Sequence, residues 1–386
     1  MSEKEYKYKL EIKENVTGLQ RIYSDSGRQN QEIRVDGKHG VWKPTLGIRK
    51  NDLKQTKISA AHYGEFIAYL LYKKIGLPVC KVDLLIRKLP IPRSKSGRLV
   101  EVPGCISYKE LKDNEDLVQA INIISWYKDV HYDEFVAITD QLNQYDNDDY
   151  KLSKHNDSNN NNIELIIPAF EAYIKERCGA SEEDCQGLRQ SLIDMIVADC
   201  KFANTDRNDE NYGLAISKDG HRFYPVFDNE YILGFPEFKE DIEKYSGARL
   251  QEHIDKDLTS RMGISSQVSK IGYKSVMTYL FTTYPEETKK SYEKVMQIKE
   301  NDLIDLMEEC EGLGEVHKSY ALRIFKERHR GFKYVKEEYI DEYGNLIPQV
   351  LPANKPSENI SKRGSSKTSK QNKKMDVHEK NERELL

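Results

Sequence analysis

The segment FANTDRNDENYGL at residues 202–214, followed by YPVFDN at residues 224–229, determines the fold that we expect for this chain. Carboxylates and amides are concentrated in the first segment, between apolar stretches. Apolar residues recur at helical spacing before it, from Leu192 to Cys200, and two short apolar runs flank the turn Lys218-Asp219-Gly220 after it. The pattern predicts a helix, a polar loop and a β-hairpin that leads to Asp228.

This order of elements would bring three oxygen-bearing side chains together. The hairpin returns Asp228 beside the loop that carries Asp206 and Asn211, which are five residues apart. Such ligands suit Mg²⁺, which usually shares its coordination with phosphates. Protein kinases use the same arrangement, with a loop Asp that accepts the substrate's hydroxyl proton, an Asn five residues later and a further Asp for metal. An Asp and an Asn at this spacing are a weak signal by themselves, because many chains contain the pair by chance.

The chain before residue 110 is predicted to form a small β-rich lobe. Residues 5–43 alternate between apolar and polar positions in short bursts broken by glycines, which indicates strands and turns. Residues 58–75 change to helical spacing, and the Gly and Pro that follow them end a helix. Strand character returns at 79–86 and again at 99–107. We therefore expect one long helix within an N-terminal sheet over residues 1–110.

The periodicity after residue 110 is mainly helical, which predicts a larger, mostly α-helical second lobe over residues 111–353. The expected helices lie near residues 115–145, 163–178, 185–204, 266–281, 286–298 and 301–332. A polar, Asn-rich stretch at 154–162 is expected to be a surface loop. From Asn354 onward, nine Lys/Arg against five Asp/Glu predict a disordered tail of net charge +4 that folding and activity do not need. The expected fold class is α+β with two lobes.

A charged pair is expected in the N-terminal lobe. Glu65 is the only acidic residue between Leu53 and Val82, and apolar residues surround it in the predicted helix. A buried carboxylate needs a cation, because an unpaired buried charge is costly. Lys43, at the end of a predicted strand, is the candidate, since protein kinases use a Lys–Glu pair to position the nucleotide's phosphates. The alternative is a Glu65 that faces solvent.

A phosphate-covering loop is harder to find, because the chain has no GxGxxG motif in front of Lys43. The turn at residues 23–27 precedes Lys43 by a suitable distance. Its small residues Ser24, Ser26 and Gly27 could bring backbone N–H groups to phosphate oxygens. The alternative is an ordinary exposed turn.

Composition narrows the class of protein. The chain has 386 residues, with 60 Lys+Arg against 64 Asp+Glu and a net charge of −4, so it lacks the basic excess of a dedicated nucleic-acid coat. No apolar run approaches the roughly 20 residues that span a bilayer, and the N-terminus shows no secretory signal. We expect a cytoplasmic protein that does not enter the membrane. Its six cysteines form no CxxC pair and are expected to be free thiols.

Over roughly residues 15–330, these features together resemble the HipA-like serine/threonine kinases. The resemblance rests on Trp42-Lys43-Pro44, the helix with Glu65, the loop Asn204-Thr205-Asp206-Arg207-x-x-x-Asn211, and Pro225-Val226-Phe227-Asp228 in place of a DFG sequence. It implies a bilobal protein-kinase-like fold that uses ATP and Mg²⁺. By the same resemblance, Lys43 with Glu65 would bind the ATP phosphates, Asp206 would be the catalytic base, and Asn211 and Asp228 would hold Mg²⁺. Cys105 and Ile106 would lie in the strand leading to the adenine-binding hinge.

The chain also departs from that family. Asn208 stands where a His often follows the Asp-Arg pair, and Lys43 comes too early for the long segment that precedes it in the family's toxins. The chain therefore resembles the short, stand-alone members, for which an antitoxin partner cannot be assumed. The expected substrate is a protein with a Ser or Thr acceptor. A lipid or small-molecule kinase stays open, because phosphoinositide lipid kinases share the Asp-Arg-x-x-x-Asn loop, and so does a nucleotide-binding pseudokinase that acts as an interaction module.

Overall fold

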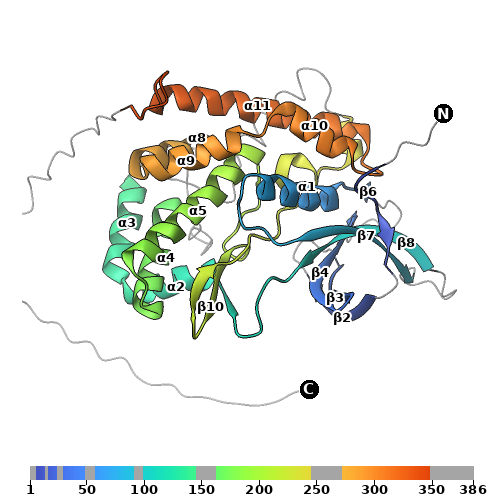
Figure 1. Ribbon diagram of the computed structural model, residues 1–386, viewed down its shortest axis with the longest axis horizontal. Coiled ribbons are helices and arrows are strands. Elements are labelled where there is room, and N and C mark those ends of the chain that lie inside the picture. Colours follow the sequence, from blue (N-terminus) through green and yellow to red (C-terminus); the bar gives the residue numbers. More distant parts are fainter. Residues whose placement is uncertain are drawn as a thin grey trace, which may run out of the picture. The chain divides into compact units, whose positions relative to one another are not determined.

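An N-terminal sheet and a set of C-terminal helices make up the fold (Figure 1). The computed structural model describes residues 6–13, 16–23, 29–47, 57–90, 99–144, 162–244 and 272–347. The strands are β1 (Glu11–Ile12), β2 (Val16–Tyr23), β3 (Gln29–Val35), β4 (Lys38–Pro44), β5 (Leu46–Gly47), β6 (Lys57–Ile58), β7 (Val82–Pro90), β8 (Leu99–Tyr108), β9 (Asp116–Gln119), β10 (Gly213–Ser217) and β11 (Gly220–Phe223). The helices are α1 (Ala61–Lys74), α2 (Ala120–Val130), α3 (Tyr132–Gln144), α4 (Ile163–Cys178), α5 (Glu182–Phe202), η2 (Ile232–Gly234), α6 (Lys239–Ile242), α8 (Tyr273–Thr283), α9 (Pro285–Met296), α10 (Glu300–Glu308) and α11 (Glu315–Tyr339).

The N-terminal sheet has six strands in the order β1-β7-β8-β4-β3-β2, and only the β1–β7 pair is parallel. The β3–β4 hairpin turns at Asp36 and Gly37, which both have positive φ, at 48° and 79°. A two-residue turn of this kind matches the twist of the strands, and Asp-Gly is a favoured sequence for it. The hairpin fixes the register of β4, in which Lys43 lies opposite Cys105 of β8.

The two faces of the sheet have different environments. Trp42 and Ile106 belong to a small apolar core on one face, whereas Cys105 belongs to the main core that includes α1. Successive residues of a strand point to opposite faces. Lys43, which follows Trp42, is therefore directed toward the face covered by α1.

Helix α1 ends in a hydrogen-bonding motif that its sequence specifies. Gly76 adopts φ 77°, and the N–H groups of Gly76 and Leu77 donate to the carbonyl oxygens of Lys73 and Tyr72 at 3.1 and 2.9 Å. This pattern is a Schellman motif, which favours Gly because only Gly adopts positive φ without strain. The helix was predicted to start at residue 58, but it starts at Ala61, because Ile58 pairs with β5.

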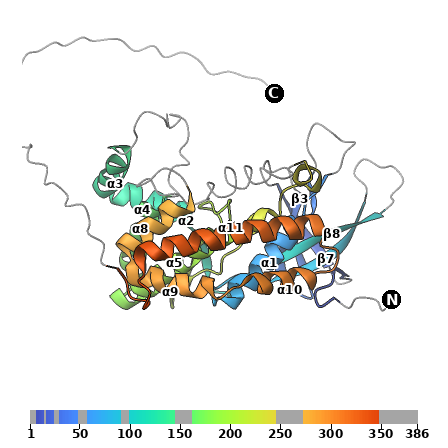
Figure 2. The same ribbon diagram turned by 90° about the horizontal axis from the view of Figure 1, so that it is seen from above.

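The C-terminal region is mainly helical, as predicted, with two differences in its boundaries. Residues 116–119, predicted as helix, form β9 in a three-stranded sheet with β10 and β11, and the rest of the predicted helix divides at His131 into α2 and α3. The helix predicted at 301–332 also divides, because Gly312 adopts φ 80° between α10 and α11. Helix α11 then packs against α5, α6, α8 and α10 (Figure 2). The expected fold class, α+β with a β-rich N-terminal part and a mostly helical C-terminal part, is confirmed.

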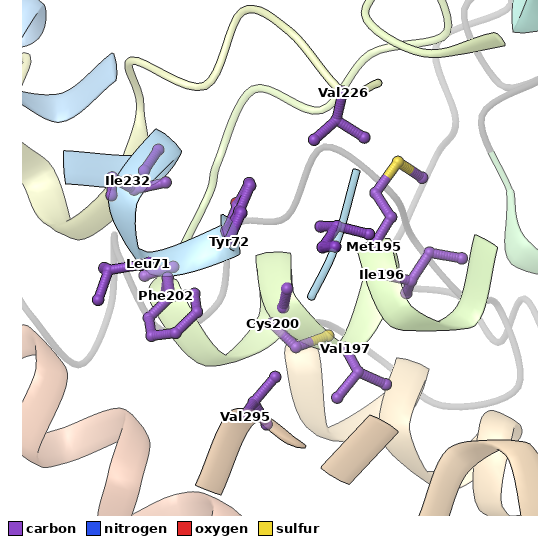
Figure 3. Close-up of a cluster of buried hydrophobic side chains, with 14 of the residues drawn as sticks. Leu71, Tyr72, Met195, Ile196, Val197, Cys200, Phe202, Val226, Ile232 and Val295 are labelled. Carbon is purple, nitrogen blue, oxygen red and sulfur yellow. The ribbon is translucent and has the colours of Figure 1, made fainter. Parts of the chain in front are cut away.

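The main apolar core joins α1 to the C-terminal helices (Figure 3). Leu71 and Tyr72 of α1 pack with Cys200 and Phe202 of α5, and the Tyr72 and Phe202 ring centroids are 5.9 Å apart. Burial of such side chains stabilises a fold by about 1.5–3 kcal/mol each. The helix that carries Glu65 is thus held from the C-terminal side as well as by the sheet.

Several predicted features lie outside the described residues. These are the Ser24, Ser26 and Gly27 turn, most of the Asn-rich stretch, and the tail from Asn354. Asn162, the last residue of that stretch, is described: it is buried and caps α4 by accepting the N–H of Glu164 at 3.1 Å. All six cysteines are described and are free thiols, as expected. Among the described residues, no helix is long and apolar enough to cross a membrane.

Candidate active site

Lys43 lies between two carboxylates. Its Nζ atom is 3.0 Å from Oε2 of Glu65 and 2.6 Å from Oδ1 of Asp228. The Lys43 and Glu65 side chains are buried, and that of Asp228 is 37% exposed. Burial alone would lower the pKa of Lys43, but the carboxylates of Asp228, Glu65 and Glu230 outweigh it and raise this pKa well above its ordinary value. Lys43 is therefore a fixed positive charge at neutral pH.

Glu65 joins three parts of the fold. Besides Lys43, its Oε2 atom accepts the backbone N–H of Asn229 at 2.7 Å, so α1, β4 and the segment after β11 meet at one carboxylate. The Glu65 side chain is completely buried, and its Oε1 atom has no hydrogen-bond partner within the described part of the chain. The sequence predicted that a cation would compensate this charge, and the structure places Lys43 there.

Helix α1 approaches the Glu230 backbone through Gly64. A Cβ atom at Gly64 would lie 2.4 Å from the carbonyl oxygen of Glu230 and 2.9 Å from Cβ of Phe235. Any larger side chain would push α1 away from the segment that contains Asp228 and Asn229. Gly64 therefore permits the close contact that sets the position of Glu65.

We expect Gly64→Ala to lower the free energy of unfolding by about 1–3 kcal/mol, the usual cost of overpacking. Gly187→Ala is the matched control, because Gly187 lies inside α5 and a Cβ there has no neighbour within 4 Å. That control should be neutral or stabilising by about 0.5–1 kcal/mol, since Ala is the better helix former. Urea denaturation of both variants measures the difference. Equal changes in the free energy of unfolding for the two variants would contradict the close contact between Gly64 and the Glu230 backbone.

Asp228 has an unusual backbone conformation. Its φ is 57°, in the left-handed region, which costs a residue other than Gly about 1 kcal/mol. Arg207 holds the chain on both sides of it, because its guanidinium donates to the carbonyl oxygen of Phe227 at 2.9 Å and to the side-chain oxygen of Asn229. This conformation turns the Asp228 carboxylate toward Lys43.

The loop that carries Asp206 is held by Asp199, which lies on α5. The Asp199 carboxylate accepts hydrogen bonds from Arg207 Nε at 2.7 Å, from Asn204 Nδ2 at 3.0 Å and from the Tyr72 hydroxyl at 2.6 Å. The side chains of Asp199, Arg207 and Asn204 are completely buried. Burial and the Asp199 charge raise the pKa of Tyr72 well above its ordinary value, so Tyr72 remains a donor. The Asp199 carboxylate thus holds the Arg207 guanidinium in place, and this guanidinium in turn supports the chain on both sides of Asp228.

Within the loop, the side chains of Asn204 and Asn211 hold the backbone on either side of Asp206. Asn204 Oδ1 accepts the N–H of Asp206 at 3.2 Å, and Asn211 Nδ2 donates to the carbonyl oxygen of Asp206 at 3.0 Å. Arg207 also donates to the carbonyl oxygen of Asn211 at 3.1 Å. Arg207 therefore links the Asn211 end of the loop to the segment containing Asp228, which brings the three predicted polar residues into one region.

The donor set fits Mg²⁺. The Nδ2 atom of Asn211 donates a hydrogen bond to the loop backbone, which leaves the Oδ1 atom as a potential metal ligand. Asp228 offers a partly exposed carboxylate. Within the described residues, no group of three or more His, Cys, Asp or Glu side chains could hold a metal ion. A metal at Asn211 and Asp228 would need further oxygen ligands from water or phosphate, which is the usual manner of Mg²⁺.

The two predicted adenine-side residues lie in the interior of the sheet. Cys105 and Ile106 are fully buried in β8, which pairs with β4 on one edge and with β7 on the other. Their backbone groups face these strands. They lie in the strand that leads to the connection into β9, and Cys105 is the direct neighbour of Lys43 in the sheet.

Sequence reasoning missed Asp199, Tyr72, Asn229 and Glu230. One signal was available for Asp199, because it directly follows the four apolar residues 195–198 and precedes Cys200. The ion pair between Lys43 and Asp228 was also not expected, since the prediction paired Lys43 with Glu65 alone.

Comparisons with known proteins identify a related fold. The chain is similar to the solved structure of the proinflammatory kinase CtkA of Helicobacter pylori, with a TM-score of 0.57 and 13% identity over 86% of this chain and 97% of that chain. At this identity the likeness shows the fold alone, and it confirms the kinase-like fold. HipA of Shewanella oneidensis, solved with HipB and operator DNA, matches with a TM-score of 0.43 and 10% identity over 83% of this chain and 67% of that chain, which is too weak to support an argument. No family model and no curated protein matches the sequence.

Proposed function

We propose that this protein is an ATP- and Mg²⁺-dependent kinase that transfers a phosphoryl group to a Ser or Thr hydroxyl of a protein. The observation that carries the proposal is Lys43, a buried and permanently charged lysine held between Glu65 and Asp228. A Lys–Glu pair beside a metal-binding Asp is the arrangement by which protein kinases hold nucleotide phosphates. The likeness in fold to CtkA supports the same class of protein.

Each residue has a role that its surroundings support. Lys43 would bind the ATP phosphates, and Glu65 would hold its ammonium in place. Asp206, on a loop whose backbone is fixed on both sides, would orient the acceptor hydroxyl and accept its proton. Asn211 and Asp228 would hold Mg²⁺, which when bound neutralises the charge of the phosphates. Catalysis would therefore depend on positioning and on charge stabilisation. The Ser24, Ser26 and Gly27 turn would cover the phosphates, and the β8 strand with Cys105 and Ile106 would lead to the adenine site.

The acceptor class is tested by offering three acceptors side by side. The protein is incubated with labelled ATP and Mg²⁺ together with a protein mixture, phosphoinositide vesicles or sugars, and the label is traced. Label on Ser or Thr of proteins is expected. Label in lipid or sugar alone would show a lipid or small-molecule kinase. Stabilisation by ATP in a thermal-shift assay without any transfer would show a nucleotide-binding interaction module instead.

The two metal-binding residues should differ in their effects. Asp228→Asn removes the negative charge offered to Mg²⁺ and keeps a residue that tolerates positive φ, whereas Asn211→Ala removes a neutral ligand. We expect Asp228→Asn to cause the larger loss of activity, and we expect added Mg²⁺ to restore Asn211→Ala more fully. Rates measured over a range of Mg²⁺ concentrations distinguish the two. Equal losses that do not depend on Mg²⁺ would show that the metal lies elsewhere.

A further inference from the structure

A basic pocket lies between the start of α10 and the middle of α11. Its volume is about 360 Å³. The cationic side chains that line it are Lys299, Lys326, Arg330 and Lys333. Those at 326, 330 and 333 follow one another at helical spacing and so share a face of α11. Four basic side chains and one acidic side chain, Glu300, line the pocket, which gives a net charge of +3.

The acidic side chains nearby compensate only part of this charge. Glu300 pairs with Lys326 at 2.8 Å, and Glu327 pairs with Arg330. Lys299 donates to the carbonyl oxygen of Met296 at 2.6 Å, which is a neutral acceptor. Lys333 has no ion-pair partner among the residues that the structure describes. The pocket therefore retains positive charge that the described residues do not neutralise.

A buried lysine lies behind the pocket wall. Lys201 of α5 is completely buried, with its Nζ atom 3.2 Å from Nδ1 of His329 and 3.8 Å from the centre of the Phe325 ring. His329 and Phe325 both line the pocket. No carboxylate lies within ion-pair distance of Lys201 in the described part of the chain, and the imidazole is its hydrogen-bonding partner there. Burial of an ammonium without a counter-charge is costly.

The positive charges of the pocket act on the buried Lys201 and on the half-buried His329. Burial, followed by the charges of Arg328, Lys299 and Lys333, lowers the pKa of Lys201 well below its ordinary value. Burial and the charges of Lys201, Lys333 and Lys299 lower the pKa of His329 to about 4, although Glu300 opposes them. An anion in the pocket would favour the charged forms of both groups. A negatively charged ligand in the pocket would therefore supply the counter-charge that Lys201 and His329 lack among the described residues.

We propose that this pocket binds a small anion of the phosphate class, such as inorganic phosphate or pyrophosphate. Several cationic side chains around one pocket favour a polyvalent anion over a monovalent one, since each cation adds to the attraction. In the tautomer whose Nδ1 accepts from Lys201, the imidazole of His329 carries its proton on Nε2 and is a further donor. None of these residues belongs to the Lys43–Asp228 site, so the proposal does not depend on the proposed kinase activity.

The test titrates the full-length protein with inorganic phosphate and with pyrophosphate in separate arms. Binding is followed by calorimetry and by the side-chain ¹⁵N signals of histidines, with His329 assigned through His329→Gln. We expect saturable binding that shifts the His329 signals, and about tenfold weaker binding in Lys333→Met. Lys336→Met is the matched control, because Lys336 lies on the same helix outside the pocket lining, and it should bind like wild type. Asp228→Asn should also bind like wild type, which separates this pocket from the kinase site.

Lys201 allows a second test, in which a substitution is expected to stabilise the protein. Without anion, Lys201→Met should melt at a higher temperature than wild type, because an apolar side chain replaces a buried amine that has no carboxylate partner in the described part of the chain. Phosphate should raise the melting temperature of wild type and have a smaller effect on Lys201→Met. Binding that is equally weak in Lys333→Met and Lys336→Met, or that leaves the His329 signals unchanged, would overturn the proposal. A Lys201→Met variant that melts lower than wild type without anion would also overturn it.

Discussion

Asp206→Asn is expected to reduce phosphoryl transfer by about 10²–10⁴-fold, the usual contribution of a general base, while the two hydrogen bonds that hold its backbone stay in place. The backbone of Asp206 is held by Asn204 and Asn211, and these bonds do not involve its carboxylate. Asn at this position keeps the size of the side chain but cannot accept the hydroxyl proton. Transfer of labelled phosphate from ATP, measured beside a thermal-shift titration with ATP, separates the loss of chemistry from a loss of binding.

Asp219→Asn is the matched control for that substitution. Asp219 lies in the turn between β10 and β11, where its carboxylate contacts Asn114 at 3.2 Å on the surface. The same change of charge at this place should leave transfer unaffected. If Asp206→Asn retained the wild-type rate, another group would have to be the base.

Asp199→Ala should have the largest effect on stability, a loss of about 3–5 kcal/mol in the free energy of unfolding, because it leaves a buried cation uncompensated. Arg207 is completely buried, and the Asp199 carboxylate lies 2.7 Å from its Nε atom. Urea denaturation measures the loss. Asp305→Ala, at an exposed position of α10, should change stability by no more than about 0.5 kcal/mol.

A double variant tests whether the buried charge is the cause. Asp199→Leu combined with Arg207→Met removes both charges, and apolar replacement of a buried pair is often close to neutral. We therefore expect the double variant to be more stable than Asp199→Ala. A double variant that loses as much as the sum of the single substitutions would show that the two residues contribute independently. Activity should remain low in the double variant, since Arg207 also holds the chain beside Asp228.

The sequence was sufficient to predict the elements around the site, because their signals are local. Asp206, Asn211 and Asp228 stand in polar stretches between apolar runs, and a hairpin between them has few alternative geometries. Glu65 could be paired with a cation because it is the single acid in an apolar helix. Periodicity and the cost of a buried charge were enough to predict the elements and the need for a cation, whereas the choice of Lys43 came from the arrangement that protein kinases use. The structure places the residues in one region.

The hydrogen bonds that Asp199 accepts from Tyr72, Asn204 and Arg207 could not be predicted in the same way. Asp199 lies beside Cys200 on a helix whose last part is buried on all sides. Helical periodicity assigns a charged residue to the solvent side, so the burial of Asp199 depends on tertiary contacts with Tyr72 and Arg207. The strand β9 was missed for a related reason. Its four residues form a strand because β10 pairs with them, and this partner lies about 100 residues later in the chain.

The attachment of α1 has a consequence for how such a protein can be switched on and off. Many kinases regulate activity by rotating the helix that carries the pairing Glu. Here the N–H of Ala60 donates to Phe235 at 3.1 Å, the hydroxyl of Tyr63 donates to Glu311 at 2.6 Å, and Lys74 pairs with Asp302 at 2.5 Å. Rotation of α1 would break all three contacts and part of the apolar core. If the proposed function holds, regulation by rotation of α1 would therefore carry a cost in stability, and control of access to the site would avoid that cost.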